Sequence, residues 1–284
     1  MAQNAAATDQ YMSVINSDSL VVPVRASTVY TAQEKSLFLG GALVPVIQAP
    51  NGVAQVPFLT SVSASTLSTE ADPGVDIAVT TPGGTKNTIT CDLIAARTVL
   101  RDLGNVDPNE IGRVLGNAVA VAFDTAVYTA LDGIAAGQQY DYNNSGNTTL
   151  SVDDIYEGVQ IIRDAGEMGQ LFAVLSPAVA TDLMKNIGTD SYAGGDFQTE
   201  ALRNGYIGKM AGVNMFMSSN ISGLTNASDG FIFGADAARI AMQANVNVEI
   251  GRRTEAVGND IVAHLHAGVG VVDETRAVRL RSVA

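Results

Sequence analysis

The longest regular pattern in the sequence lies between Asp107 and Gly133 and predicts one long helix. Asp107 can cap the first free amide groups, and Pro108 has the fixed φ that suits the first helical position. Glu110 stands at the capping-box position, and Gly133 can adopt the left-handed conformation that closes many helices. Residues 119–123 (V-A-V-A-F) are apolar on every side, so we expect neighbours to bury this helix on more than one side.

The clearest strand patterns lie near the C-terminal end of the chain. In residues 245–250 and 261–271, apolar side chains alternate with polar residues or glycine, which is typical of strands with one buried face. We expect these two strands and a third over residues 277–283 to form an antiparallel sheet. The long helix is the element predicted to cover the apolar face of that sheet.

The amino-acid composition changes between residues 43 and 92, where five prolines are spaced among serines and threonines. Strand-like pieces at 53–60 and 88–93 lie on either side of a polar stretch, and this predicts a long β-hairpin that projects from the body of the protein. The stretch 60–69 cannot bury enough apolar surface to be stable alone. We therefore expect the hairpin to pack on another subunit.

Helix and strand patterns alternate between residues 137 and 238, which predicts a compact α/β module. Ser151 can form a capping box with Asp154, and Ser176-Pro177 is a second helix start. Short strands are predicted at 171–175, 213–217 and 231–233, and a loop at 188–198.

The N-terminal residues 1 to about 28 are polar, small and aperiodic, which predicts an extended arm. A short helical turn over 30–39 should follow it, ending at Gly40-Gly41. The predicted organisation is an arm with a short helix (1–42), a hairpin (43–92), a body (93–136 and 239–284, with the long helix at about 108–132) and an inserted module (137–238).

The composition favours self-association. The chain of 284 residues is 46% apolar but only 16% charged, so we expect much of its exterior to be covered. Its formal net charge of −13 argues against nucleic-acid binding through phosphate neutralisation, although an acidic container can enclose nucleic acid. There is no secretory signal and no uninterrupted apolar run of ~18 residues, which predicts a soluble protein made in the cytoplasm.

Residues that could carry chemistry are few. His264 and His266 share one face of a strand and could bind a metal with a carboxylate from elsewhere, but two histidines at a solvent or subunit face are the favoured interpretation. Cys91 is the single cysteine, which excludes an intrachain disulfide and a cysteine-based zinc site. Residues 141–152 resemble a calcium loop, except that Val152 replaces the bidentate acid.

No catalytic or phosphate-binding motif is present either. The sequence has no G-x-S-x-G and no P-loop, and Gly268-Val-Gly270 lies in a predicted strand, which is the wrong context for a dinucleotide site. We therefore predict no catalytic, cofactor-binding or metal-binding residues.

Basic side chains are the remaining candidates. Lys86 is the only lysine of the hairpin and could form an isopeptide link to a neighbour, but a solvated lysine is the favoured interpretation. For the arginines we expect salt bridges to acidic residues of a neighbouring subunit; these are Arg252, Arg253, Arg276, Arg279 and Arg281.

The order of these parts resembles the major capsid proteins of tailed phages with the Hong Kong 97-type fold. Three local pieces are similar to that family: I-A-A-R-T-V-L-R-D-L-G-N-V-D-P-N-E-I-G-R-V-L from Ile94, N-G-Y-I-G-K-M-A-G-V-N-M-F-M-S-S-N from Asn204 and A-G-V-G-V-V-D-E-T-R-A-V-R-L from Ala267. The resemblance implies an α+β fold in which the arm is the N-arm, the hairpin the E-loop, the long helix the spine of the P-domain, and the module the A-domain.

The resemblance also implies a non-enzymatic shell subunit. Such subunits form hexamers and pentamers that close into an icosahedral head around double-stranded DNA, with hairpins and N-arms over neighbouring subunits. The arm is too short to include a scaffolding segment, so we expect a separate scaffolding protein, a portal during assembly, and no membrane partner. An encapsulin-type compartment and an α/β enzyme are the two alternatives.

Proline at Ala120 tests the predicted long helix. Ala120→Pro should unfold the subunit, because an interior helix proline costs ~3 kcal/mol or more. Circular dichroism of the purified variant would measure this. A variant with native helix content would contradict the prediction.

Overall fold

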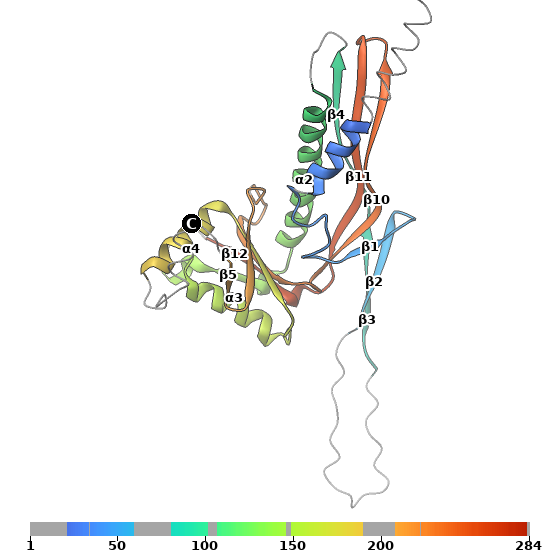
Figure 1. Cartoon of the computed structure of the whole chain (residues 1–284). Helices are drawn as coiled ribbons and strands as arrows, with labels where there is room; N and C mark the ends of the chain where they lie inside the picture. Colours follow the sequence, from blue (N-terminus) through green and yellow to red (C-terminus); the bar gives the residue numbers. More distant parts are fainter. Residues whose placement is uncertain are drawn as a thin grey trace, which may run out of the picture.

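The computed structural model describes residues 22–33, 35–59, 81–101, 107–145, 149–189, 208–221 and 223–282. In these residues the chain forms two units and a projecting hairpin (Figure 1). One unit, the body, consists of a four-stranded sheet, the long helix α2 and a helix over residues 22–33. The other, the module, is a six-stranded sheet with helices α3 and α4.

The sheet of the body has the strand order β1-β10-β11-β4. Its strands are β1 (Val46–Gln48), β4 (Asp92–Arg101), β10 (Ala238–Arg253) and β11 (Gly258–Val271). β11 is antiparallel to both β10 and β4, which confirms the predicted pairing of the two long C-terminal strands. The alternating pattern of β11 gives it one buried face, as predicted. Ile261, Ala263 and Leu265 are fully buried, while the side chains between them are partly exposed.

Helix α2 (Pro108–Asp132) crosses this sheet and contacts β11 and β4. Asp107 caps it, since its carboxylate accepts a hydrogen bond from the Asn109 amide at 3.0 Å. Two end details differ from the prediction. The Glu110 carboxylate lies 3.6 Å from Arg113, its partner one turn further along the helix, and Gly133 is right-handed, with φ −76°.

The buried side of α2 spirals around the helix. Its buried residues form adjacent pairs that repeat every four positions: Ile111, Gly112, Leu115, Gly116, Val119, Ala120, Phe123, Asp124, Val127, Tyr128, Leu131 and Asp132. Because a turn takes 3.6 residues, the buried side rotates by about 40° per repeat, or about 200° from the first pair to the last. Successive turns therefore contact different neighbours.

The prediction that neighbours bury α2 on more than one side is confirmed, but the burial does not extend all the way round the helix. Val121 is 38% exposed and Ala122 is also exposed, so at each level one side of the helix stays open. The middle of α2 is apolar on several sides because the line of buried residues rotates around the helix there. By length and composition alone α2 could cross a membrane, but a core helix meets the same criterion, and half of its most apolar window is buried.

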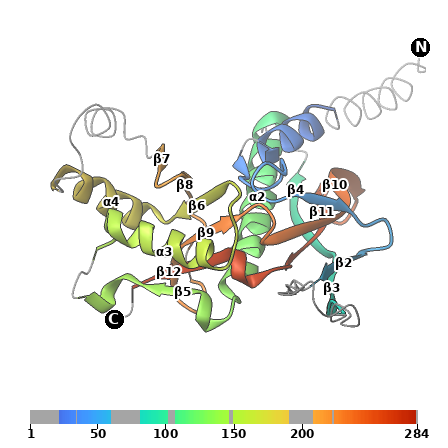
Figure 2. The same cartoon turned by 90° about the horizontal axis from the view of Figure 1, so that it is seen from below.

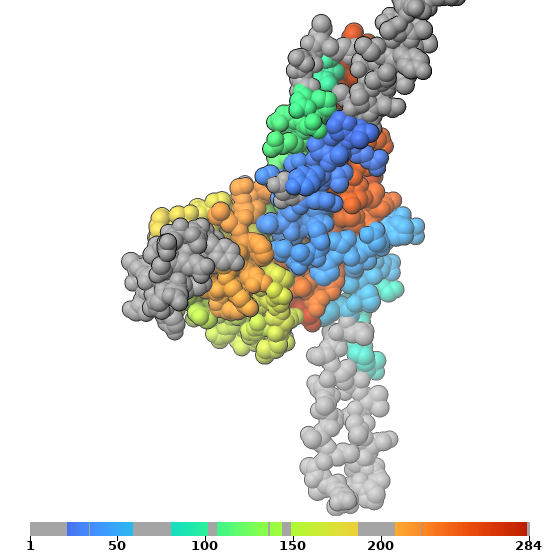
Figure 3. All heavy atoms as spheres, viewed as in Figure 1, coloured from blue at the N-terminus to red at the C-terminus, as the bar shows by residue number. Residues whose placement is uncertain are grey.

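The helix over residues 22–33 packs against α2 through two glycines. A Cβ at Gly112 would lie 1.8 Å from Ser27 Oγ and 2.7 Å from the Val24 carbonyl oxygen. A Cβ at Gly116 would lie 2.5 Å from the Thr28 carbonyl oxygen. This helix begins earlier than the predicted turn over 30–39, within the stretch predicted to be extended, because the crossing on α2 stabilises it. Figure 3 shows it lying across α2.

The sheet of the module has the order β5-β12-β9-β6-β8-β7. Its strands are β5 (Gln139–Asp141), β6 (Leu171–Leu175), β7 (Lys209–Met210), β8 (Val213–Met217), β9 (Ser228–Gly234) and β12 (Ala277–Arg281). Short 3-10 helices occur at Ala136–Gln138, Tyr142–Ser145 and Glu274–Arg276. The predicted strands at 171–175, 213–217 and 231–233 are confirmed.

Helices α3 (Val152–Asp164) and α4 (Pro177–Thr189) contact each other beside this sheet (Figure 2). The predicted capping box is present, because the Ser151 amide donates to Asp154 at 2.7 Å while the Asp154 amide donates to Ser151 Oγ. Every side chain of β6 is buried, since α3 and α4 lie on one side and the core around α2 on the other. Most of the predicted loop over 188–198 lies outside the described residues.

The predicted place of the last strand was wrong. β12 does not join the sheet of the body but lies between β5 and β9 in the module. A short alternating stretch does not identify its partners, and here Val278 and Leu280 are fully buried in the core around α3 and α4. The predicted domain boundaries otherwise stay a prediction, with residues 277–281 moved to the module.

Gly116→Ala tests the close helix crossing. Alanine should favour an isolated helix by ~1 kcal/mol. The clash with the Thr28 carbonyl should outweigh this, and overpacking of this kind costs about 1–3 kcal/mol. Urea unfolding of the unassembled subunit should therefore show a less stable variant.

Gly137→Ala is the control, because no atom lies within 4 Å of a Cβ built there. A Gly116→Ala subunit as stable as the control would show that the two helices do not pack closely.

Candidate functional site

The hairpin projects from the body (Figure 1). β2 (Val53–Leu59) and β3 (Gly84–Thr90) are antiparallel, with Val53 opposite Thr90 and Leu59 opposite Gly84. The predicted hairpin is confirmed, but its second strand begins earlier than predicted, and the end of the predicted piece 88–93 belongs to β4. Its buried side chains are confined to the root, where Ala54 and Ile89 pack against Ala49 and Ala241. The described outer part therefore has no core of its own. The polar stretch 60–69 and the residues 75–80, whose sequence V-D-I-A-V-T is also strand-like, lie outside the described residues.

Two glycines of β11 allow the hairpin root to lie directly on the sheet. A Cβ at Gly268 would lie 2.0 Å from the Thr90 carbonyl oxygen, and one at Gly270 would lie 2.6 Å from Ile89 Cγ1. The Asn87 amide group donates to the Val272 carbonyl at 2.8 Å. Gly268-Val-Gly270 thus serves close backbone packing, and its place in a strand confirms the predicted context.

A second candidate surface is the open side of α2, which we call the uncharged face. It consists of Val114, Asn117, Ala118, Val121, Ala122, Thr125, Ala126 and Thr129. The hydroxyl of Thr125 donates to the Val121 carbonyl at 2.7 Å, and that of Thr129 donates to the Thr125 carbonyl at 2.8 Å. These two polar groups are therefore already hydrogen-bonded within the helix. Val114 is 61% exposed beside a shallow apolar hollow between α2 and β4.

The C-terminal end of α2 is held on the module by polar contacts of Asp132. Its carboxylate accepts hydrogen bonds from the Asn226 amide at 2.8 Å and from the Ser228 hydroxyl. Its main-chain carbonyl accepts from the Asn226 side chain at 2.6 Å and from Arg279 Nη1 at 2.9 Å. These residues come from α2, β9, the turn before it and β12, so they connect the body to the module.

Asp124, in the middle of α2, holds the segment that follows the N-terminal helix. Ser36 Oγ donates to its carboxylate at 2.6 Å, and the Leu37 amide donates at 3.3 Å. Burial raises the pKa of Asp124 above its usual range, although these donors and the Asn220 side chain oppose the shift. All these partners donate, which is the arrangement that an ionised carboxylate requires.

The sequence profile of the phage capsid protein family matches residues 107–280. The chain belongs to this family. The matched region includes α2, the whole module and the long strands β10 and β11.

Solved structures show the same fold as this capsid protein. A structure from Microbacterium phage Oxtober96 has a TM-score of 0.68 at 13% identity, covering 88% of this chain and 91% of that one. The capsid of cyanophage P-SCSP1u has a TM-score of 0.64 at 16% identity, covering 84% and 86%. A virus-like particle from Pyrococcus furiosus has a TM-score of 0.62 at 10% identity, covering 91% and 97%.

The predicted α+β architecture of the Hong Kong 97-type is confirmed by these likenesses. At such low identities they concern the fold alone. A comparison with curated proteins found no match.

The arginines are used differently from the prediction. Arg276 and Arg281 form ion pairs within the subunit, Arg281 with Asp141 at 2.6 Å, and Arg279 binds Gln139 and the end of α2. The expectation of partners in a neighbouring subunit was therefore wrong for these three residues. Asp141 and Glu167, which pair with Arg281 and Arg276, are far away in sequence, so no local pattern reveals them, whereas Asp273 lies only three residues before Arg276. Arg253 lies 3.7 Å from Glu255 in the same chain.

The two histidines lie side by side on β11, with ring centroids 5.6 Å apart. In the parts of the chain that the structure describes, they belong to no group of three or more potential metal ligands. Lys86 is exposed in β3, and Cys91 lies at the hairpin root, where its thiol contacts the Ala241 carbonyl. Asp141, the first residue of the loop similar to a calcium site, is the ion-pair partner of Arg281.

Sequence reasoning missed the buried acids that connect the parts of this capsid protein. One signal was available, since Asp124 is the single charged residue between Arg113 and Asp132. A lone acid within an apolar helix indicates a buried polar contact. Asp132 and Glu167 had no such signal, because their partners lie in distant segments.

Asp124→Asn tests the buried carboxylate by pH. Because its pKa is raised in the folded chain, the folded state binds the proton more tightly than the unfolded state. The wild-type free energy of unfolding should therefore fall as pH rises from ~3.9, the ordinary aspartate value, through the raised value. The variant lacks this titration, so its stability relative to wild type should increase with pH and then level off.

Denaturant unfolding of both unassembled proteins, between about pH 4 and pH 7, measures this difference. A difference in free energy that stays constant over that range would contradict the assigned role of burial at Asp124.

Proposed function

We propose that this capsid protein assembles with itself into hexamers and pentamers that close into an icosahedral shell. The observation that carries this proposal is the hairpin, whose core is confined to its root while its outer strands are exposed. A projecting element without a core is stabilised when a neighbouring subunit covers it. The role is structural, in the virion, and no catalytic step is part of it.

The uncharged face of α2 supports assembly as well. Val114 and Val121 are exposed on a helix whose open side carries no charge from Val114 to Thr129. Contacts with another subunit in the shell would remove this apolar surface from water. The low charge of the chain, 16% of its residues, agrees with an exterior that is largely covered.

We further propose that the shell encloses double-stranded DNA without sequence-specific binding. A net charge of −13 is suited to a wall that does not adhere to its contents. A separate scaffolding protein and a portal are the proposed partners during assembly in the host cytoplasm, and no membrane partner is proposed. The similarity to phage capsids supports this reading over a protein-filled compartment.

Electron microscopy of the expressed protein tests the proposal. Capsomers or closed shells are expected, whereas a monodisperse monomer at high concentration would overturn it. Nuclease treatment and mass spectrometry of particles from infected cells would then identify the contents. Enclosed protein cargo in place of DNA would favour an encapsulin-type compartment.

Shortening the hairpin tests its role in assembly. Replacing residues 60–83 by a two-residue Asn-Gly turn joins Leu59 of β2 to Gly84 of β3 and leaves the root contacts of Ala54 and Ile89 intact. The subunit should keep its circular dichroism spectrum and its unfolding midpoint. Its yield of shells should fall strongly, as measured by sedimentation and microscopy.

Lys86→Arg is the matched control within the hairpin, because it retains the strand and the charge. It should assemble like wild type. Shells of normal yield and shape from the shortened variant would refute the role of the hairpin.

A further inference from the structure

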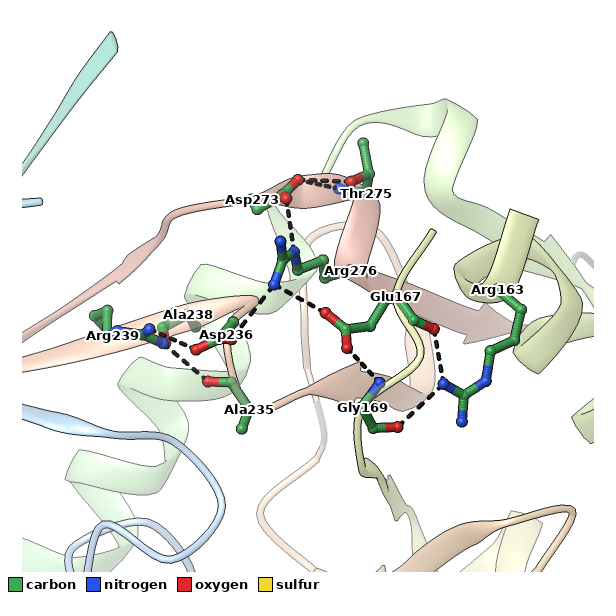
Figure 4. A network of polar contacts seen from close by, with 10 residues as sticks. All are labelled: Arg163, Glu167, Gly169, Ala235, Asp236, Ala238, Arg239, Asp273, Thr275 and Arg276. Atoms are coloured by element: carbon green, nitrogen blue, oxygen red, sulfur yellow. Dashed lines mark hydrogen bonds and ion pairs between the residues drawn. The ribbon is translucent and has the colours of Figure 1, made fainter. Parts of the chain in front are cut away.

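A chain of ion pairs connects the body to the module (Figure 4). It starts at Arg239 in β10, whose Nη2 lies 2.6 Å from Asp236. Arg276 Nη1 lies 3.4 Å from the same Asp236 and 2.9 Å from Glu167, which follows α3. Glu167 in turn accepts the Gly169 amide at 2.6 Å. Charges of alternating sign therefore run from a strand of one unit to a turn of the other.

Arg276 is the centre of this chain. Its Nε also donates to Asp273 at 2.9 Å, so a single guanidinium meets three carboxylates, from Glu167, Asp236 and Asp273. Asp273 and Glu167 are only 11% and 12% exposed, whereas Asp236 is 56% exposed. A guanidinium presents five donors in a fixed planar fork, whereas an ammonium group is a compact charge on a flexible stem and holds its partners in less defined directions.

The network lies where the backbone passes from one unit to the other. The chain crosses between the two units in three segments, which we call passages. The first follows α2, the second joins β9 to β10, and the third joins β11 to β12. Asp236 lies in the second passage, and Asp273 and Arg276 lie in the third. Glu274 in the third passage accepts the Ala135 amide of the first at 3.2 Å, and the Val272 amide donates to the Ala237 carbonyl at 2.8 Å. All three passages are thus tied together.

The core of the subunit does not depend on this network. Tyr128 of α2 stacks on Phe231 of β9, and Asp132 binds Asn226 and Ser228, so the two units are also joined by apolar packing and by buried hydrogen bonds. Loss of Arg276 should therefore leave the subunit folded. What it removes is a directional restraint between the turn after α3 and the strands of the body.

We propose that Arg276 is a positioning residue that fixes the angle between the module and the body, and thereby the curvature of the shell. This inference rests on the proposed assembly function. Because the hairpin extends from the body and the module lies to one side of it (Figure 1), the two units would meet different neighbours in a shell, and the angle between them would set the inclination of adjacent subunits. A small change in that angle is repeated at every copy and alters the size of the closed particle.

The experiment compares wild type, Arg276→Gln and Arg276→Lys with the control Arg113→Gln. The control removes an arginine of the same chain whose ion pair, with Glu110 at 3.6 Å, lies within the first turns of α2. Shell diameters are measured by cryo-electron microscopy. Arg276→Gln should broaden or shift the diameter distribution, Arg276→Lys should do so less, and the control should match wild type.

The angle itself is measured on unassembled subunits. Labels at Tyr156→Cys on α3 and Val114→Cys on α2, both exposed positions, in a Cys91→Ser background report the distance between the units by pulsed electron resonance. Arg276→Gln should broaden this distance distribution. Added salt should broaden it in wild type less than the substitution does, because only Asp236 of the three carboxylates is well exposed to screening, and it should have little further effect in Arg276→Gln.

The outcomes separate this inference from the proposed function. Wild-type protein that forms no shells, alone or with scaffolding protein, refutes the assembly function. Normal wild-type shells, together with unchanged diameters and unchanged label distances in folded Arg276→Gln, overturn the role of Arg276 alone. An unfolded Arg276→Gln subunit, judged by circular dichroism, would also overturn it, because the network would then be part of the stability of the fold.

Discussion

The rotation of the buried side of α2 is the constraint on which the rest of the subunit depends. A four-residue repeat on a helix of 3.6 residues per turn directs successive turns to different neighbours. The first turns contact the N-terminal helix through Gly112 and Gly116, and the last turns contact the module through Tyr128 and Asp132. One straight helix thereby joins elements that do not share a face. The same geometry leaves an open, uncharged side along its length.

Glycines allow the closest contacts between elements of the subunit, because they have no side chain to keep the backbones apart. Gly112 and Gly116 admit a helix, and Gly268 and Gly270 admit the root of the hairpin. Both crossings place parts that extend from the subunit against its most regular elements. The N-terminal helix and the root of the hairpin are therefore packed closely against α2 and β11.

Local patterns predicted the elements well but not all of their partners. The caps at Asp107 and Ser151 and the alternation of β11 depend on neighbouring residues, so the sequence reveals them. Contacts across the chain leave no periodic signal, and they determine the place of β12, the pairing of Arg281 with Asp141, and the pairing of Arg276 with Glu167 and Asp236. The N-terminal helix was missed because its stability comes from α2 and not from its own sequence.

The place of β12 between the edge strand β5 and the rest of the sheet has a consequence for how the protein is made. It follows every other strand of the module in sequence, yet it lies between β5 and β9. Until residues 277–281 have left the ribosome, β5 has no partner in the sheet and the core beside α3 lacks Val278 and Leu280. A nascent chain therefore cannot complete its module, so assembly is restricted to subunits whose synthesis has passed this strand.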